Sequence, residues 1–438
     1  MLSRRRSRHG CQRTVVAGAL ITRMEDGAAL IDSRFGPIVQ AQKMRIGDGE
    51  PQWWLVTTQL ARHPVGNIFT DSPASSAGTS LDLDEAVARA IGEAVERYCG
   101  LNWRLDPIAG KLRETSLLGR WPRCAPDEPA TGVAREIRPD DMLTFVRAQR
   151  VGDDSFHLVP AGFVAMGFEP VPPEPVVAFP ISTGLAFHPR RCIAIWNALC
   201  EVIERDAVMS AWWIHRPLRE IDMADAPHIV TRRLRRLDAC GMNARIFDIT
   251  TELGVPTVFC VLTSARYPRL VVSAATKASP ALACAKALDE VVSMRVALRA
   301  GPNGADSGDG KPDSLVGHAR YYASASDHPA FDFIAPGVAE RISYPEFAAR
   351  QIAQPDDDVT LRRAIRLIEQ QDVTVLWVDL TTPDVHSLGT VARVVVPEAV
   401  PLSPRDDARW LATKRLLLRS GTAHESRDAF TPHPHPFA

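Results

Sequence analysis

A polar signature written twice, each time within an apolar helical pattern, constrains this chain more than any other feature. It comprises Glu93, Glu96 and Arg97 in AIGEAVERYCG, and then Glu201, Glu204 and Arg205 in ALCEVIERDAV. Two glutamates three residues apart lie on one face of a helix, and the arginine that follows puts a cation beside them. Carboxylates in this arrangement suit a divalent metal ion and the polyphosphate that such an ion accompanies.

The second copy lies in a helix predicted over residues 193–213 that has no solvated face. At about 100° per residue, its polar side chains fall into one narrow stripe, formed by Asn197, Glu201, Glu204 and Arg205. Burial of two carboxylates and a guanidinium is unfavourable unless these groups are paired, hydrogen-bonded or bound to a metal. The stripe therefore predicts a binding site.

Two further helices carry similar polar groups. The helix predicted over residues 83–99 holds the first copy on the face opposite its apolar stripe, and that face alone would be interpreted as solvated. The helix predicted over residues 281–300 sets Lys286 and Glu290 on one face, where a surface ion pair is the commoner interpretation. Their coincidence with the buried stripe favours one shared site for Mg²⁺ and a nucleotide.

The composition argues against several classes of function. A net charge of −1 over 438 residues gives no overall attraction to nucleic acid or membranes, and no apolar run could span a bilayer. Eight cysteines without a CxxC pair favour reduced thiols over disulfides or a zinc site. We expect a soluble cytoplasmic protein whose 45% hydrophobic residues supply a large core.

The order of predicted strands and helices indicates an α/β fold. Short apolar runs from residue 28 to 70 predict strands, and the turns SSAGTS and ISTGLA are expected to precede the two signature helices. The absence of Walker A and GxGxxG sequences argues against P-loop and Rossmann nucleotide sites. We expect a basic disordered arm over residues 1–20, one domain over 21–425 with its core motifs in 70–400, and a tail over 426–438.

The tail ends in the alternating sequence Pro432-His433-Pro434-His435-Pro436. Such a run stiffens into polyproline II, which needs no internal hydrogen bonds. By itself it is typical of a disordered chain end, which is expected to contribute little to the core.

Taken together and in this order, these motifs resemble the YcaO family of ATP-using enzymes that modify peptide backbones. The similarity runs from about residue 70 to 438 through SAGTSLDLDEAVARAIGEAVERY, ISTGLAFHPRRCIAIWNALCEVIERDA, ALACAKALDEVVSMR and the terminal PxPxP. It implies one large domain of mixed sheets with helices packed around a site for ATP and Mg²⁺.

The resemblance also implies roles for individual residues. The metal-site carboxylates would be Glu93, Glu96, Glu201, Glu204 and Glu290. The nucleotide contacts would be Arg97, Asn197, Arg205 and Lys286. In the tail, a positioning role in catalysis would fall to Pro432, Pro434 and Pro436. The chain departs from the family at two places. Family members often have Gly-Lys-Gly where this chain has Ser76-Ala77-Gly78, and often an acidic residue where this chain has Ile193.

The implied activity is ATP-dependent cyclodehydration of a ribosomally made precursor peptide, in which a Cys, Ser or Thr side chain closes an azoline ring. Little sequence precedes the first motif, so a separate E1-like or ThiF-like partner is expected to deliver the peptide. Two alternatives stay open, a thioamide- or amidine-forming enzyme and a non-catalytic ATP-binding accessory protein. The identity of the peptide and the choice of nucleophile are left open. So is the oligomeric state, for which a homodimer is one possibility.

Overall fold

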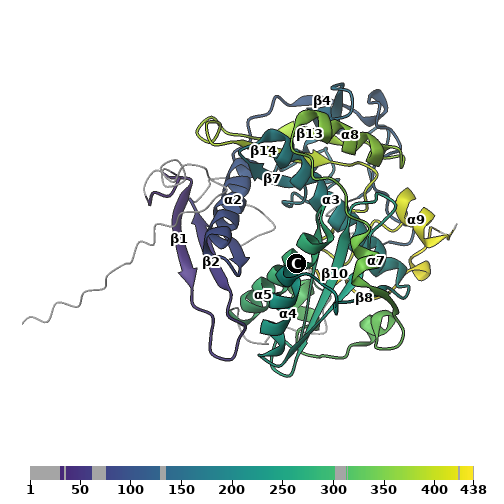
Figure 1. Ribbon diagram of the computed structural model, residues 1–438. Coiled ribbons are helices and arrows are strands. Elements are labelled where there is room, and N and C mark those ends of the chain that lie inside the picture. Colours follow the sequence, from purple (N-terminus) through teal and green to yellow (C-terminus); the bar gives the residue numbers. More distant parts are fainter. Residues whose placement is uncertain are drawn as a thin grey trace, which may run out of the picture.

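The computed structural model of the protein describes residues 30–33, 36–61, 75–128, 135–300, 312, 314–422 and 425–437. The predicted basic arm lies outside the described residues, as does most of the Gly/Asp/Ser-rich segment after residue 300. Helices and three sheets make up the described part (Figure 1), which confirms the predicted α/β class.

Strands form three separate sheets. The first is antiparallel, in the order β1 (Ile38–Met44), β2 (Trp54–Leu60) and β3 (Ser75–Ser80). The second has the order β11 (Leu270–Thr276), β10 (Thr257–Ser264), β9 (Met242–Asp248), β8 (Arg219–Asp222) and β12 (Glu340–Ser343), with only the β8 and β12 pair parallel. The third has the order β4 (Ile108–Lys111), β5 (Met142–Arg150), β13 (Leu376–Asp379), β14 (Thr390–Val395) and β7 (Leu185–His188), with β6 (Phe156–Pro160) beside β5.

Helices pack against these sheets. The α-helices are α2 (Leu83–Leu101), α3 (Arg191–Ile214), α4 (His228–Asp238), α5 (Pro280–Ala300), α6 (Leu315–Tyr322), α7 (Tyr344–Ala348), α8 (Asp358–Glu369) and α9 (Lys414–Ser420). The short 3₁₀ helices are η1 (Leu112–Glu114), η2 (Ala161–Phe163), η3 (Pro329–Ile334) and η4 (Arg427–Ala429). Of the helices that the structure describes, none combines the length and apolar character needed to cross a bilayer.

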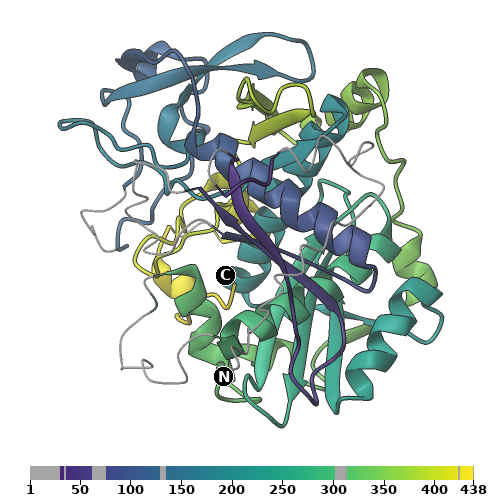
Figure 2. The same cartoon turned by 90° about the vertical axis from the view of Figure 1, so that its left-hand side faces the viewer.

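The arrangement makes α3 the central helix. It contacts β14 and β7 of the third sheet and β11 of the second, while α2 covers the first sheet and α5 covers β10 and β11 (Figures 1 and 2). Because α3 is surrounded by these elements, its apolar side chains are buried all round, including Trp196, Trp212 and Trp213. The prediction of a signature helix without a solvated face is confirmed.

One segment differs from the expectation. SSAGTS was expected to form a turn, but it forms the edge strand β3, and α2 lies directly against it. A Cβ atom at Gly78 would lie 1.9 Å from the carbonyl oxygen of Ala86 on α2, so glycine is required for close approach and not for a turn. Asp82 then caps α2 by accepting the Glu85 N–H at 3.0 Å.

The C-terminal tail is part of the core. Phe437 is 3% exposed and packs with its ring centroid 5.4 Å from that of Phe259 on β10, and the His435 side chain is 1% exposed. Figures 1 and 2 both show the chain ending among the other elements. The expectation that the tail contributes little to the core is therefore wrong.

Side-chain donors fix the tail because proline has no N–H and leaves backbone carbonyls that need partners. Five consecutive carbonyls, those of residues 431 to 435, each accept a hydrogen bond. The donors are Arg409 (3.0 and 2.8 Å, to the first two carbonyls), Trp212 (3.1 Å), Tyr322 (2.6 Å) and His318 (2.7 Å). The tail is thus held in one conformation along its length.

Candidate functional site

The polar face of α2 points into the protein toward β3 and β7. Glu93 accepts the backbone N–H of Ala77 at 3.1 Å and pairs with Arg97 at 2.7 Å. Glu96 accepts the N–H of Phe187, on β7, at 2.8 Å. This face is half-buried, so the interpretation of it as solvated is wrong.

The polar stripe of α3 is tied to the ends of two other strands. Glu201 accepts the N–H of Gly184, just before β7, at 3.1 Å, and Glu204 accepts the N–H of Thr276, the last residue of β11, at 3.0 Å. Arg205 lies 3.7 Å from Glu201 and 3.8 Å from Glu204. These four glutamates of α2 and α3 share one device, in which a backbone N–H holds one carboxylate oxygen and thereby orients the group.

Helix α5 adds a third set of charges. Lys286 and Glu290 form an ion pair of 3.0 Å. Burial alone would lower the pKa of Lys286, but the carboxylates of Glu290 and Glu204 outweigh burial and hold this pKa above its ordinary value. Lys286 therefore faces the α3 stripe as well as its own helical neighbour, which favours the shared site over an isolated surface pair.

Two carboxyl groups of this cluster have raised pKa values, mainly because they are buried. Burial raises the pKa of Glu96 to about 8, and the charges of Glu93 and Glu201 add to the effect. Burial likewise raises the pKa of Glu204 to about 7, with Glu290 and Glu201 contributing in the same direction. Since Glu201 acts on both groups, the carboxylates of α2, α3 and α5 form one electrostatic cluster.

Lys277 belongs to this cluster but escaped the sequence analysis. It follows the last residue of β11, and its pKa is lowered first by burial and then by the charge of Lys286, while Glu204 and Glu290 oppose the shift. Helical spacing cannot reveal a lysine at the end of a strand. The only signal was a single cation directly after a largely apolar run, LVVSAAT.

The remaining predicted residues lie on α3 and in the tail. Asn197 is half-buried on α3, one turn before Glu201, and its amide has no hydrogen-bond partner in the described part of the chain. In the tail, Pro432 is exposed, whereas Pro434 and Pro436 are buried. The pKa of His435 is held well below its ordinary value by burial and by His318, and the charge of Arg205 also contributes. The tail thus approaches the α3 stripe.

The donor set fits Mg²⁺ with a polyphosphate better than a metal bound by protein alone. Among the described residues, no three His, Cys, Asp or Glu side chains converge closely enough to hold a metal ion. Mg²⁺ usually takes one or two carboxylates and completes its shell with phosphate oxygens and water. The Nε atoms of Arg97 and Arg205 are buried without hydrogen-bond partners in the described part, which suits an anionic ligand.

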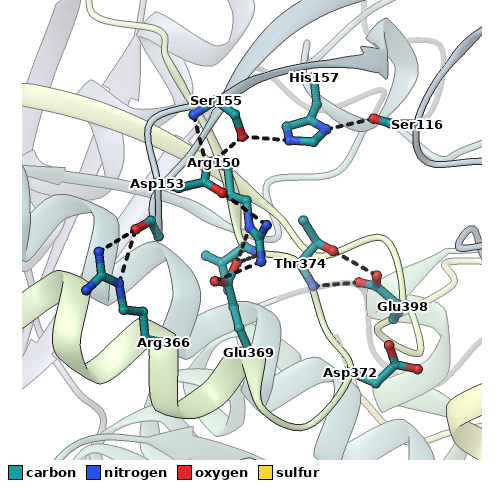
Figure 3. A network of polar contacts seen from close by, with 12 residues as sticks. Ser116, Arg150, Asp153, Ser155, His157, Arg366, Glu369, Asp372, Thr374 and Glu398 are labelled. Carbon is teal, nitrogen blue, oxygen red and sulfur yellow. Dashed lines mark hydrogen bonds and ion pairs between the residues drawn. The ribbon is translucent and has the colours of Figure 1, made fainter.

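A second polar network, shown in Figure 3, brings together two serines, a histidine and an aspartate. Ser116 lies 2.8 Å from His157 Nδ1, and Ser155 links His157 Nε2 (3.0 Å) to Asp153 (2.6 Å). Both serines are exposed, and the aspartate contacts Ser155 and not the imidazole. This geometry lacks the direct carboxylate contact that orients a catalytic histidine.

The same network has a structural role. Arg150 on β5 forms a bidentate pair with Glu369 at the end of α8 (3.0 and 3.2 Å), and Glu369 also accepts the N–H of Val375 at 3.1 Å (Figure 3). These contacts join β5 of the third sheet to the end of α8.

Comparison with known proteins gives one family. The family described as YcaO cyclodehydratase, ATP- and Mg²⁺-binding, matches residues 77–400. An uncharacterized protein of Methanothermobacter thermautotrophicus is 34% identical over 229 residues, which cover 50% of this chain and 56% of that protein. The chain therefore matches only about half the length of this curated relative.

Solved structures show the same fold. A heterocyclase in complex with substrate and cofactor superposes with a TM-score of 0.74 at 17% identity, over 94% of this chain and 57% of that one. YcaO from Methanopyrus kandleri, bound with AMPPCP and Mg²⁺, gives 0.59 at 18% identity, over 86% and 89%. The E. coli microcin synthetase McbBCD complex with pro-MccB17 bound gives 0.59 at 17% identity, over 90% and 96%.

Proposed function

This chain belongs to the YcaO family, whose ligands are ATP and Mg²⁺, and from this we propose that it is an ATP-dependent cyclodehydratase. Its substrate would be a ribosomally made precursor peptide, and its product an azoline ring formed from a Cys, Ser or Thr residue and the preceding peptide bond.

The observation that carries this proposal is the convergence of two ExxER helices. Four glutamates from α2 and α3 are each oriented by a backbone N–H, and two of them, Glu96 and Glu204, have pKa values raised to about 8 and 7. Buried carboxylates that resist ionisation do not stabilise a fold, so their presence here points to a ligand that pairs with them. A divalent cation brought in with a nucleotide supplies the missing positive charge.

We assign the roles as follows. The metal would be held by carboxylates drawn from Glu93, Glu96, Glu201, Glu204 and Glu290. The phosphates would be contacted by Arg97, Arg205 and Lys286, with Asn197 and Lys277 nearby. These groups are fixed before the ligand arrives, so they can neutralise phosphate charge without reorganisation.

Ring closure requires the removal of two protons and one oxygen from the peptide. The peptide nucleophile adds to the preceding carbonyl carbon and loses its proton, the amide nitrogen loses its proton, and the carbonyl oxygen departs. When bound, Mg·ATP supplies the phosphoryl group that makes this oxygen a leaving group. The peptide loses one water per ring, and its oxygen ends in inorganic phosphate.

The tail and a partner protein complete the proposal. The segment from Pro432 to Pro436 would lie beside the reacting amide and help to position it, since His435 already lies within the field of Arg205. A separate E1-like or ThiF-like protein would deliver the peptide. The structural similarity to the McbBCD complex, which has pro-MccB17 bound, supports a precursor peptide and partner proteins.

The test is reconstitution with ATP, Mg²⁺, the partner and a short Cys/Ser/Thr-rich peptide encoded beside this chain. We expect peptide-dependent ATP hydrolysis and a peptide lighter by one water per ring. The Glu201→Gln variant, folded but without this activity, is the matched control. ATP binding without any change in peptide mass would favour an accessory protein, and oxygen-to-sulfur exchange would indicate thioamide formation.

A further inference from the structure

A second hollow lies on the other side of α3 from Glu204. It offers about 90 Å³ of space to the centre of a water-sized sphere, several times what one water molecule needs. Its walls are mostly apolar and come from α3, β14 and the segments around residues 178 and 400. The polar side chains among its lining residues are Thr183, Arg205 and Arg393.

Arg393, on β14, is a buried cation without a counter-ion. Its side chain belongs to a residue only 4% exposed, and it forms no ion pair within the described part of the chain. Its Nε and one terminal nitrogen donate to the carbonyl of Phe163 at 3.0 and 2.8 Å, and the other terminal nitrogen donates to Ile181 at 3.0 Å. Burial lowers the pKa of Arg393 to about 10, and only Glu201 opposes the shift.

The Arg393 side chain has more N–H donors than acceptors around it. A guanidinium has five N–H groups, and three are used, so one on each terminal nitrogen has no acceptor among the described residues. Two N–H groups on adjacent nitrogens match the two oxygens of a carboxylate. A phosphate would need further donors, and beside Arg393 the lining offers only Thr183 and Arg205, whose guanidinium already pairs with Glu201 and Glu204.

The hollow borders the carboxylate cluster but is distinct from it. On α3, Arg205 lies about 60° around the helix from Val202, which lines the hollow, and about 40° from Glu201. Glu204 lies farther round, toward β11. Arg205 therefore separates the two spaces.

One wall of the hollow is strained and strongly supported. Trp410, which lines it, has φ of +60°, a conformation that costs a bulky residue free energy. The carboxylate of Glu128 holds this turn by accepting the N–H groups of Arg409 (2.8 Å), Trp410 (3.1 Å) and Leu411 (2.7 Å). Strain maintained in this way is typical of positions where a side chain must present a surface to a ligand.

From the apolar walls, the uncompensated cation and its two open N–H groups, we infer that this hollow binds a carboxylate carried on a compact apolar body. Arg393 is the anion contact, and Trp410 and Val202 contact the apolar part. The ligand is either a free acid or the last residue of a peptide. Binding there requires neither ATP nor the proposed activity.

Isothermal titration calorimetry on the full chain without nucleotide tests this inference. The probes are hexanoate and its neutral isostere hexanamide, and a leucine-terminated tripeptide with a free carboxylate and the same tripeptide as an amide. We expect each acid to bind about tenfold or more tightly than its amide, since a hydrogen bond to a charged group accounts for at least that factor. Binding of hexanoate alone identifies a free acid, and binding of the tripeptide as well identifies a chain end.

Variants separate the site from the fold. Arg393→Gln should abolish the preference for the acid, whereas Arg393→Lys should retain part of it. Ala178→Leu fills the hollow without touching the hydrogen bonds of Arg393 and should prevent binding, which keeps the test decisive if Arg393→Gln does not fold. The exposed Arg232→Gln is the matched control. Equal affinity for acid and amide, no binding of either acid, or undiminished binding in Ala178→Leu would overturn the inference.

Discussion

Replacing Glu96 by glutamine should stabilise the nucleotide-free protein at alkaline pH while weakening its affinity for Mg·ATP. The substitution keeps the oxygen that accepts the Phe187 N–H and removes only the charge. The Glu96 carboxyl is buried and lies near the charges of Glu93 and Glu201, so its ionisation is unfavourable in the folded protein. A metal ion, however, requires the ionised carboxylate.

The sign and size of the stability effect follow from the shift in pKa. The pKa of Glu96 rises from an ordinary 4.5 to about 8, so the folded protein keeps a proton that the unfolded chain releases. The stabilising contribution of the protonated group is fully present below pH 4.5 and is lost as the pH rises to about 8. The whole shift corresponds to about 5 kcal/mol, and partial exposure of the side chain reduces the expected effect to about 2 kcal/mol.

Thermal unfolding at pH 5 and pH 8.5 measures this effect. For a chain of this length, 1 kcal/mol moves Tm by only about 1 °C, so we expect Glu96→Gln to match the parent at pH 5 and to exceed it by about 2 °C at pH 8.5. Glu340→Gln, an exposed position on β12, should change neither value. A Glu96→Gln protein no more stable than the parent at pH 8.5, or one with undiminished Mg·ATP affinity, would refute the reasoning.

Three further predictions follow from the same geometry. The affinity for Mg·ATP should rise between pH 6 and pH 8 with release of protons, because the Glu204 pKa is raised to about 7, and calorimetry in buffers of different ionisation enthalpy should show a smaller release in Glu204→Gln. Deletion of residues 432–438 should lower Tm as well as activity, since it removes the buried Phe437 at a cost of about 3 kcal/mol, and an unchanged Tm would contradict the observed packing. Gly78→Ala should destabilise the protein more than Gly47→Ala in denaturant titrations, because a Cβ has no room at the first position and meets nothing at the second.

Periodic apolar patterns predicted the helices that carry the site. The expected helix over residues 193–213 is observed as Arg191–Ile214, and that over 281–300 as Pro280–Ala300. The burial of two glutamates and an arginine within α3 could be inferred because nothing in that helix offered a solvated face. Local spacing was sufficient here, since each polar group lies on the same helix as the apolar residues that bury it.

Tertiary contacts decided the features that the sequence analysis missed. Gly78 was interpreted as a turn residue, but its role depends on the backbone of Ala86 across a strand and helix interface. Lys277 joins the cluster only because β11 ends beside α3 and α5. Arg393 stands in an ordinary strand sequence, and its lack of a counter-ion is visible only when its surroundings are assembled. None of these relations has a fixed spacing along the chain.

The tail is the clearest case in which composition gave a wrong prediction, that of a disordered chain end. A proline-rich end is disordered when its carbonyls find better partners in water than in the protein. Here the donors to these carbonyls lie on three separate parts of the chain. They are Trp212 on α3, His318 and Tyr322 on α6, and Arg409 before α9. The His318 ring also stacks on that of His435 at 3.8 Å, and burial lowers the pKa of His318 to about 4, so both rings pack as neutral groups near physiological pH. Because prolines restrict the unfolded tail as well, ordering it costs little entropy, and a few well-placed donors suffice to bring the chain end to the polar stripe of α3.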